Sequence, residues 1–335
     1  NGKAMLRILN PTHSDIQLHA REILANVIQI EEPNIFAMET PSSMSSGNSD
    51  NKLNFDLSNS DLTPAQKKIL LEFLHKHKYS FASDLSELGR TAEYKHKIET
   101  VPGARPVRLP HYRTTPQNLA EIDRQVQELL QNDIIEPSNS EWHSPVLLVK
   151  KPTGEFRFVV DYRKLNKSTI PMSFPLPQLE DVFDSLGASS PKYFTSLDLK
   201  SGFWQLEMDP STKHKAAFIT QSGVYEWKRM PFGLMNAPIS FQTLMTSVLR
   251  GIHWKFVLCY IDDILIFSPS FEVHLQHLQE VFARLAQANL NLHPSKCHFA
   301  MKELKFLGHI ITRRGVEVDS TKTDIISQYL SLIHI

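Results

Sequence analysis

Residues 256–268 read Phe-Val-Leu-Cys-Tyr-Ile-Asp-Asp-Ile-Leu-Ile-Phe-Ser, an apolar stretch that two adjacent carboxylates, Asp262 and Asp263, interrupt. An ionised carboxylate is costly to hold among apolar residues unless a cation compensates its charge. The β-prone residues on both sides predict a hairpin with strands over 256–261 and 264–268 and the acidic pair at the turn. The stretch therefore predicts two carboxylates at one exposed end of a sheet, ready for a divalent metal.

A second strand with an acid at its end lies upstream. Residues 193–199, Tyr-Phe-Thr-Ser-Leu-Asp-Leu, read as a strand in which Asp198 is the odd member. A single acid at a strand end is more often a cap or turn residue than a catalytic one. Combined with Asp262 and Asp263, however, it gives three carboxylates that one sheet could bring together. Such oxygen ligands are those that Mg²⁺ takes alongside substrate phosphates.

The composition is that of an ordinary soluble globular protein. The 335 residues are 41% hydrophobic and 21% charged, which is enough for two domains or one large composite domain. The 36 basic and 36 acidic residues balance, so only local patches can indicate a nucleic-acid partner. Cys259 and Cys297 give no disulfide framework and fit a reduced compartment. A run of about 18 apolar residues, as a membrane span requires, is absent.

The N-terminal part offers little that could form a core. It starts Asn-Gly-Lys-Ala, without an initiator Met or a signal pattern, which suggests a piece of something longer. Residues 39–51 are rich in Ser, Asn and Asp and predict a linker. Thr63-Pro64-Ala65-Gln66 then predicts the start of a helix, and Thr115-Pro116 the start of another. The buried stripe expected on the first helix consists of Ile69, Leu70, Phe73 and Leu74.

Two basic segments are candidates for phosphate contact. Residues 105–113 carry three arginines and no acid, although a solvated loop is the commoner reason for such a run. Residues 146–160 predict a hairpin with turn chemistry at 151–154. Lys151 near its tip and Arg157 on the returning strand could converge on a polyphosphate. A solvated basic hairpin explains the same residues equally well.

Two further helices are predicted over 178–186 and 271–289. His274 and His277 lie three residues apart on the second one. A zinc site needs two more ligands, and the sequence offers none nearby, so both histidines are expected to be solvated.

Blocks of sequence around the acids resemble the reverse transcriptases of gypsy-type LTR retrotransposons. Tyr-Ile-Asp-Asp at 260–263, followed by Ile-Leu-Ile-Phe-Ser, is similar to the family's active-site motif. A four-residue string alone carries a high risk of a false match, but further blocks follow the family's order. These are Ser-Pro-Val-Leu-Leu-Val-Lys-Lys (144–151), Phe-Arg-Phe-Val-Val-Asp-Tyr-Arg-Lys-Leu-Asn-Lys (156–167), Ser-Leu-Asp-Leu-Lys-Ser-Gly-Phe-Trp-Gln (196–205), Met-Pro-Phe-Gly-Leu-Met-Asn-Ala-Pro (230–238) and Phe-Leu-Gly-His (306–309).

The resemblance implies an α+β fold with the right-hand architecture of a polymerase. It has fingers and a palm, whose antiparallel sheet is backed by helices, and it is truncated before the thumb and RNase H. The implied divisions are a flexible linker over 1–62, an N-terminal extension over 63–114, interleaved fingers and palm over 115–312 and a non-matching tail over 313–335. Because the family's thumb grips the duplex, we expect this chain to bind primer-template weakly and to copy it poorly.

The resemblance also implies an activity, that of an RNA-directed DNA polymerase. Asp198, Asp262 and Asp263 match the ligands of two Mg²⁺ ions, for which Mn²⁺ could substitute, in a transfer from a dNTP to a primer 3′-hydroxyl. Arg157 and either Lys150 or Lys151 match the grip on the incoming triphosphate. Phe203 lies five residues after Asp198, where the family places an aromatic ring that excludes a ribose 2′-hydroxyl. Without that spacing, Phe203 would be taken for a core residue.

Further site residues follow from the same matches. They are Phe232 and Gly233 under the nucleotide, Phe306, Leu307 and Gly308 in the hairpin that holds the primer, and Lys296 as a candidate general acid for pyrophosphate. The implied partners are an RNA or DNA template-primer, dNTPs, and downstream RNase H and integrase domains, with no membrane. The implied setting is the cytoplasm, within virus-like particles. A relic that no longer copies, or a different palm-type nucleotidyltransferase, remains the alternative.

Overall fold

In the computed structural model, the described residues are 55, 57, 60, 62–151, 154–174, 181, 184–187, 191–313 and 315–318. All of them belong to one unit, Glu39–Ile335. Nearly all of the linker expected over 1–62 lies outside the described residues. So do most of the helix expected over 178–186 and most of the tail over 313–335.

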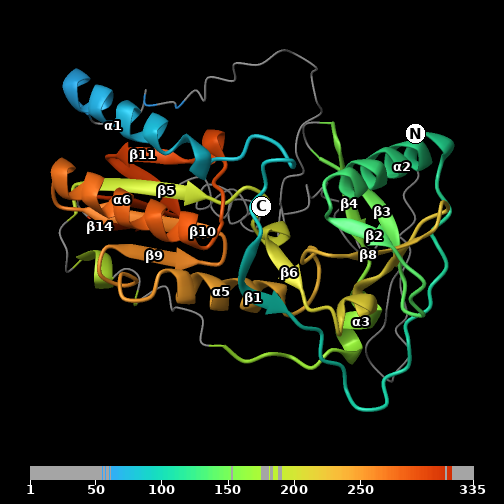
Figure 1. The fold of residues 1–335 in the computed structure, drawn as a ribbon. Coiled ribbons are helices and arrows are strands. Elements are labelled where there is room, and N and C mark those ends of the chain that lie inside the picture. Colours follow the sequence, from blue (N-terminus) through green and yellow to red (C-terminus); the bar gives the residue numbers. More distant parts are fainter. Residues whose placement is uncertain are drawn as a thin grey trace, which may run out of the picture. The chain divides into compact units, whose positions relative to one another are not determined.

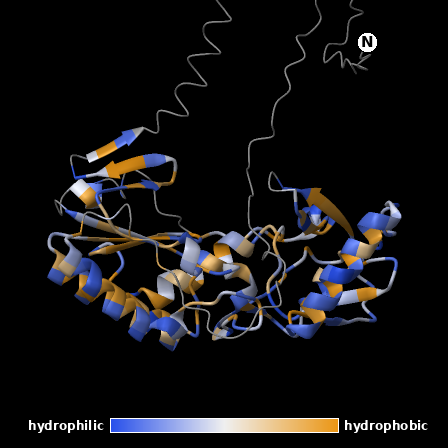
Figure 2. Ribbon diagram, turned by 90° about the horizontal axis from the view of Figure 1, so that it is seen from above, coloured by the Kyte–Doolittle hydropathy of each residue, from blue (hydrophilic) through white to orange (hydrophobic). Residues whose placement is uncertain are grey.

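The acidic hairpin forms one side of a four-stranded sheet with the order β11-β5-β10-β9, in which its second strand is central and its first is at the edge (Figure 1). These strands are β5 (Tyr193–Asp198), β9 (Val257–Tyr260), β10 (Asp263–Ser268) and β11 (His298–Met301). β10 runs antiparallel to both of its neighbours. Helices α5 (Ala237–Val248) and α6 (Phe271–Gln287) lie along one face, and hydrophilic residues mark their outer sides in Figure 2. This sheet is the expected palm.

A small antiparallel sheet packs on the palm strands opposite to the helices. It consists of β12 (Glu303–Phe306), β13 (His309–Thr312) and β14 (Gly315–Val318), so the expected tail begins with a strand that pairs with β13. Leu304 and Phe306 join the core formed by Phe194, Leu265 and Phe267. Side chains alternate between the faces of a strand, so residues 194, 196 and 198 share this face with 263, 265 and 267.

A five-stranded sheet with the order β2-β8-β7-β3-β4 forms the expected fingers. The predicted basic hairpin is present as β3 (Ser144–Lys150) and β4 (Phe156–Val160). The other strands are β2 (Ile135–Pro137), β7 (Phe218–Ile219) and β8 (Val224–Trp227). The nearby helices are α2 (Pro116–Gln131), which has the predicted Thr115 as its N-cap, and α3 (Arg163–Ser168). A parallel pair, β1 (Thr91–His96) and β6 (Leu206–Met208), forms a separate two-stranded sheet.

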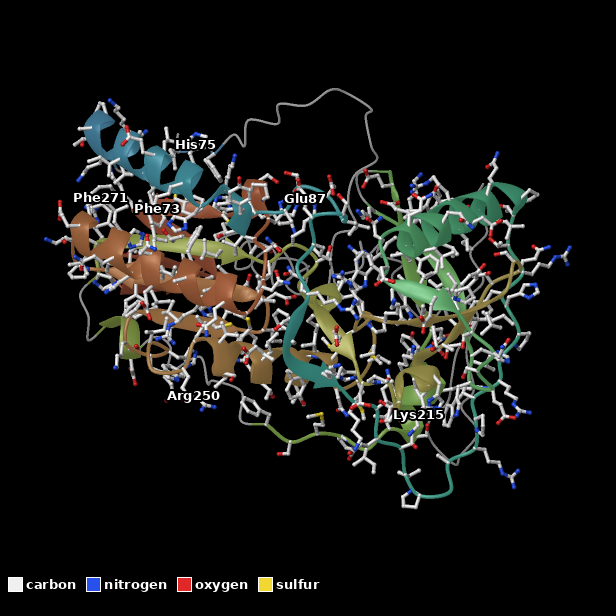
Figure 3. The ribbon with its side chains drawn as sticks, in the orientation of Figure 1. Phe73, His75, Glu87, Lys215, Arg250 and Phe271 are labelled. Carbon is white, nitrogen blue, oxygen red and sulfur yellow. The ribbon has the colours of Figure 1, made fainter. Side chains whose placement is uncertain are left out.

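The N-terminal extension packs on the palm. Helix α1 (Pro64–Lys76) begins at the predicted Thr63, with a complete capping box to Gln66. Phe73 points toward α6 (Figure 3), where its ring centroid lies 5.6 Å from that of Phe282. The prediction of a four-residue buried stripe was wrong in one position, because Ile69 is 48% exposed. Helix α1 buries a narrow stripe that includes Leu70 and Leu74, and Ile69 lies outside it.

The expectation that both histidines of α6 are solvated was wrong for His274. Its side chain is fully buried and hydrogen-bonded to Thr195 Oγ1 at 2.7 Å and to Ser268 Oγ at 2.8 Å. His277 shares the Ser268 hydroxyl and stacks on Phe256 with a centroid distance of 3.7 Å. Both hydroxyl partners lie on palm strands: Thr195 is 79 residues away in sequence, and Ser268 is six residues away. His274 is therefore a polar core residue that ties α6 to the sheet.

Acid should destabilise the chain through its buried histidines. Burial lowers the pKa of His274 to about 3 and that of His96, which bonds Ser240, to about 4. Below the ordinary histidine pKa of about 6.5, these two side chains bind protons in the unfolded chain but stay neutral in the folded chain. Stability should therefore be complete above about pH 6.5 and fall, by up to about 1.4 kcal/mol per pH unit for each histidine, as the pH drops toward these values.

Urea unfolding at pH 7.5, 6 and 5 measures this slope. The variant His274→Asn should show a flatter dependence, whereas the exposed His111→Asn should keep the parent's slope. A slope that His274→Asn leaves unchanged would contradict the assignment.

In the described residues, no helix is both long enough and apolar enough to cross a membrane.

Candidate active site

The hairpin register places two of the three acids directly opposite each other. Asp198 at the end of β5 pairs with Asp263 at the start of β10. Like charges in this position repel, so the arrangement costs stability unless a cation compensates. Tyr260 pairs with Asp263 across the hairpin, which leaves Ile261 and Asp262 as the two-residue turn. The turn was predicted at Asp262 and Asp263, one residue too late in the chain, since Asp263 already belongs to the strand.

The third acid, Asp262, is held in a setting that disfavours its charge. Burial, followed by the charges of Asp198 and Asp263, raises the pKa of Asp262 to about 8. Its Oδ1 atom is buried and has no hydrogen-bond partner among the described residues. Lys296 lies nearby, with Nζ 3.7 Å from Asp198 Oδ1. The charge of Lys296 partly offsets the effect of the neighbouring carboxylates on Asp262.

These residues fit divalent cations by donor type and charge. Hard cations take carboxylate oxygens, and a bound cation would offset the repulsion that raises the pKa of Asp262. In the ranges that the structure describes, no three His, Cys, Asp or Glu side chains already form a metal-ligand group.

The basic hairpin separates the two candidate lysines. Arg157 lies opposite Val149, and Lys150 lies opposite Phe156. Alternation therefore puts Lys151 and Arg157 on one face of the hairpin and Lys150 on the other. Lys151 Nζ contacts Glu155 Oε2 at 3.1 Å. The register therefore makes Lys151 the lysine that shares a face with Arg157.

An aromatic cluster lies beside the acids. Phe203, in a short 3₁₀ helix (Gly202–Gln205), is only 5% exposed and stacks on Phe232 with a centroid distance of 5.1 Å. Its other neighbour is Phe241 of α5, at 5.4 Å. Gly233 is exposed and has φ +90°, a conformation that favours glycine, and its carbonyl accepts a hydrogen bond from Asn166 Nδ2 at 2.9 Å. The structure thus brings Phe203 and Phe232 together.

The strands of the β12–β13 hairpin pack on the palm, and its turn is half-buried. Leu307 and Gly308 form the turn, with φ +49° and +78°. Phe306 is 3% exposed within the core, so its ring has a packing role. Leu307 also packs partly against this core, whereas Glu303 and Lys305 of β12 are exposed.

The sequence did not single out three residues that contact the acids. The His293 N–H donates to the Asp198 carbonyl at 2.8 Å. A Cβ on Gly202 would lie 3.2 Å from Asp262 Oδ1. Gln242 of α5 hydrogen-bonds to the turn backbone. Gln242 is a polar side chain beside Phe241, and both are buried.

Comparisons with known proteins give consistent results. Residues 149–311 match the family model of reverse transcriptase (RNA-dependent DNA polymerase). The chain is 39% identical over 304 residues to the retrovirus-related Pol polyprotein from transposon 297 of Drosophila melanogaster. The aligned region covers 88% of this chain and 28% of that protein. The chain is 37% identical over 214 residues to the Pol polyprotein from transposon gypsy of the same organism, covering 62% of this chain and 20% of that protein. The chain therefore spans less than a third of these relatives.

Solved structures confirm the fold class. The foamy viral protease-reverse transcriptase in complex with RNA/DNA hybrid superposes with a TM-score of 0.72 at 24% identity, covering 81% of this chain and 36% of that chain. The same viral protein in complex with dsDNA superposes with a TM-score of 0.68 at 26% identity, covering 81% and 56%. The predicted α+β architecture of fingers and palm is thus confirmed.

Proposed function

The chain contains a reverse transcriptase domain of the kind found in gypsy-type Pol polyproteins, and from this premise we propose that it is an RNA-directed DNA polymerase. In the proposed reaction, a primer 3′-hydroxyl paired to an RNA or DNA template attacks the α-phosphate of a dNTP and displaces pyrophosphate. The relatives are Pol polyproteins, so we further propose that the domain works as a segment of one, beside RNase H and integrase.

The observation that carries the proposal is the position of the three acids. Asp198 and Asp263 are register partners on the palm face that the β12–β13 hairpin also occupies, and Asp262 forms the adjoining turn. We propose that Asp198 and Asp262, completed by Asp263, hold two Mg²⁺ ions. Bound there, the ions would lower the pKa of the attacking hydroxyl and stabilise the charge on the leaving group.

The other side chains bind and orient the substrates. Lys151 and Arg157 share a face of the fingers hairpin, where a point charge and a planar fork can grip a triphosphate together. Lys151 Nζ lies 3.1 Å from Glu155 Oε2 at the tip of this hairpin. Lys296, held 3.7 Å from Asp198, is a candidate to protonate the departing pyrophosphate. The Leu307–Gly308 turn is the proposed contact for the primer end.

Primer extension by the purified chain tests the function. An RNA template, a DNA primer, dNTPs and Mg²⁺ should give extended DNA, and Asp262→Asn should not. Absence of product with the parent chain at saturating primer-template would favour a relic that no longer copies. Incorporation of ribonucleotides alone would favour another palm-type nucleotidyltransferase.

Replacing Phe203 should weaken the discrimination between deoxyribonucleotides and ribonucleotides. The ring packs against Phe232 and Phe241, so it cannot easily move aside to make room for a 2′-hydroxyl. Phe203→Val removes the outer part of the ring, and incorporation of a ribonucleotide relative to its deoxy counterpart should rise by about one to two orders of magnitude. The ratio of kcat/KM for the two nucleotides measures this within one variant. An unchanged ratio would assign Phe203 to packing alone.

A further inference from the structure

The backbone of the acidic turn adopts a strained conformation. Ile261, the residue before Asp262, has φ +53°. A β-branched residue rarely adopts this left-handed conformation, because its Cβ approaches the following carbonyl oxygen too closely. The conformation persists only where the surroundings enforce it. The contacts of the turn should therefore include the groups that hold it.

One buried side chain bonds the turn on both sides of Tyr260. Gln242 of α5 is 1% exposed, and its Oε1 accepts the Ile261 N–H at 2.7 Å. Its Nε2 donates to the Cys259 carbonyl at 3.2 Å. On the other edge, the Cys259 N–H donates to His253 Nε2 at 3.3 Å. Gln242 thus supplies the buried partner for two backbone groups that flank Tyr260, and its removal would leave both groups without that partner.

The same helix reaches the nucleotide pocket through the neighbouring residue. Phe241 packs on Phe203, and its Cζ atom lies 3.0 Å from the position of a Cβ on Gly202. That Cβ position is also 3.2 Å from Asp262 Oδ1. Helix α5 therefore contacts the proposed nucleotide pocket through one residue and the acidic turn through the next.

We propose that Gln242 is a positioning residue that holds the strained Ile261–Asp262 turn in the conformation in which Asp262 binds divalent metal. This inference rests on the proposed function for its catalytic consequence, but not for its metal-binding consequence. Gln242 touches neither metal nor substrate. It acts through the backbone on either side of Tyr260 and fixes where the Asp262 carboxylate is placed.

The variant Gln242→Met tests the proposal, since it keeps the length and volume of the side chain and removes both hydrogen bonds. Thr243→Val is the matched control. It lies on the same helix, and its hydroxyl bonds only the Ile239 carbonyl within that helix, at 2.9 Å. The readouts are Mn²⁺ binding to the full chain by calorimetry and the Mg²⁺ dependence of primer extension.

We expect Gln242→Met to weaken Mn²⁺ binding and to raise the Mg²⁺ concentration for half-maximal extension, each by about tenfold, with a lower kcat. Thr243→Val should match the parent in both. A Gln242→Met chain that melts at a lower temperature but keeps the parent's Mn²⁺ affinity would overturn the proposal, as would a parent chain that binds no Mn²⁺. If the parent binds Mn²⁺ but extends no primer, the proposed function fails, and the Mn²⁺ comparison still decides the role of Gln242.

Discussion

Asp262→Asn is expected to abolish primer extension without destabilising the fold. The amide keeps the shape of the carboxyl group but loses the charge that would bind a cation, so the rate should fall by about three orders of magnitude or more. In the metal-free chain the same change should raise the melting temperature at neutral pH. The pKa of Asp262 is raised to about 8 by burial and by its acidic neighbours, which means that its ionised form opposes folding.

Melting curves with and without Mg²⁺ separate the two effects. A ligand that binds only the folded state raises its stability, so Mg²⁺ should stabilise the parent and have less effect on Asp262→Asn. Asp184→Asn is the control, because Asp184 is an exposed acid outside the palm strands, and it should behave as the parent in both assays. An Asp262→Asn chain that extends primers at the parent's rate would contradict the assigned role.

The hairpins and helix starts could be predicted because their signals are local. Alternation and turn residues define β3–β4 and β9–β10. Thr63 and Thr115 cap the N-termini of the helices that begin at the next residue. The grouping of Asp198 with the acidic pair was also foreseeable, because Asp198 ends one predicted strand and the pair lies where a predicted hairpin turns. Which acid faces which depends on register, and β5–β10 register is set by packing between segments far apart in the chain.

The predictions failed where a distant segment decides the environment of a residue. Helical spacing puts His274 on the same face as Phe271 and Leu278. Its burial also needs hydrogen-bond partners for the two ring nitrogens, which Thr195 and Ser268 supply. Those hydroxyls belong to two strands whose packing against α6 the sequence does not reveal. The positioning contact of Gln242 was missed for the same reason, since it depends on α5 crossing beneath the hairpin turn.

Gly89→Ala should be the most destabilising of the glycine substitutions. The added Cβ would collide with the Asn289 carbonyl oxygen and would lie 2.5 Å from Asn291 Oδ1. Neither neighbour can move freely, because Asn289 Nδ2 donates to the Arg90 carbonyl at 2.9 Å and Asn291 Nδ2 donates to the Tyr79 carbonyl at 3.0 Å. We expect a loss of about 3 kcal/mol in the free energy of unfolding, measured with urea.

The same substitution should also reduce activity, because the obstructed loop continues into the active site. Two residues beyond Asn291, the His293 N–H donates to the Asp198 carbonyl at 2.8 Å. A displaced loop therefore shifts the backbone that carries Asp198. Gly187→Ala is the matched control, since nothing lies within 4 Å of its added Cβ, and it should leave both stability and extension near the parent's values. If Gly89→Ala unfolded at the parent's urea concentration, the N-terminal segment could not be rigidly packed against this loop.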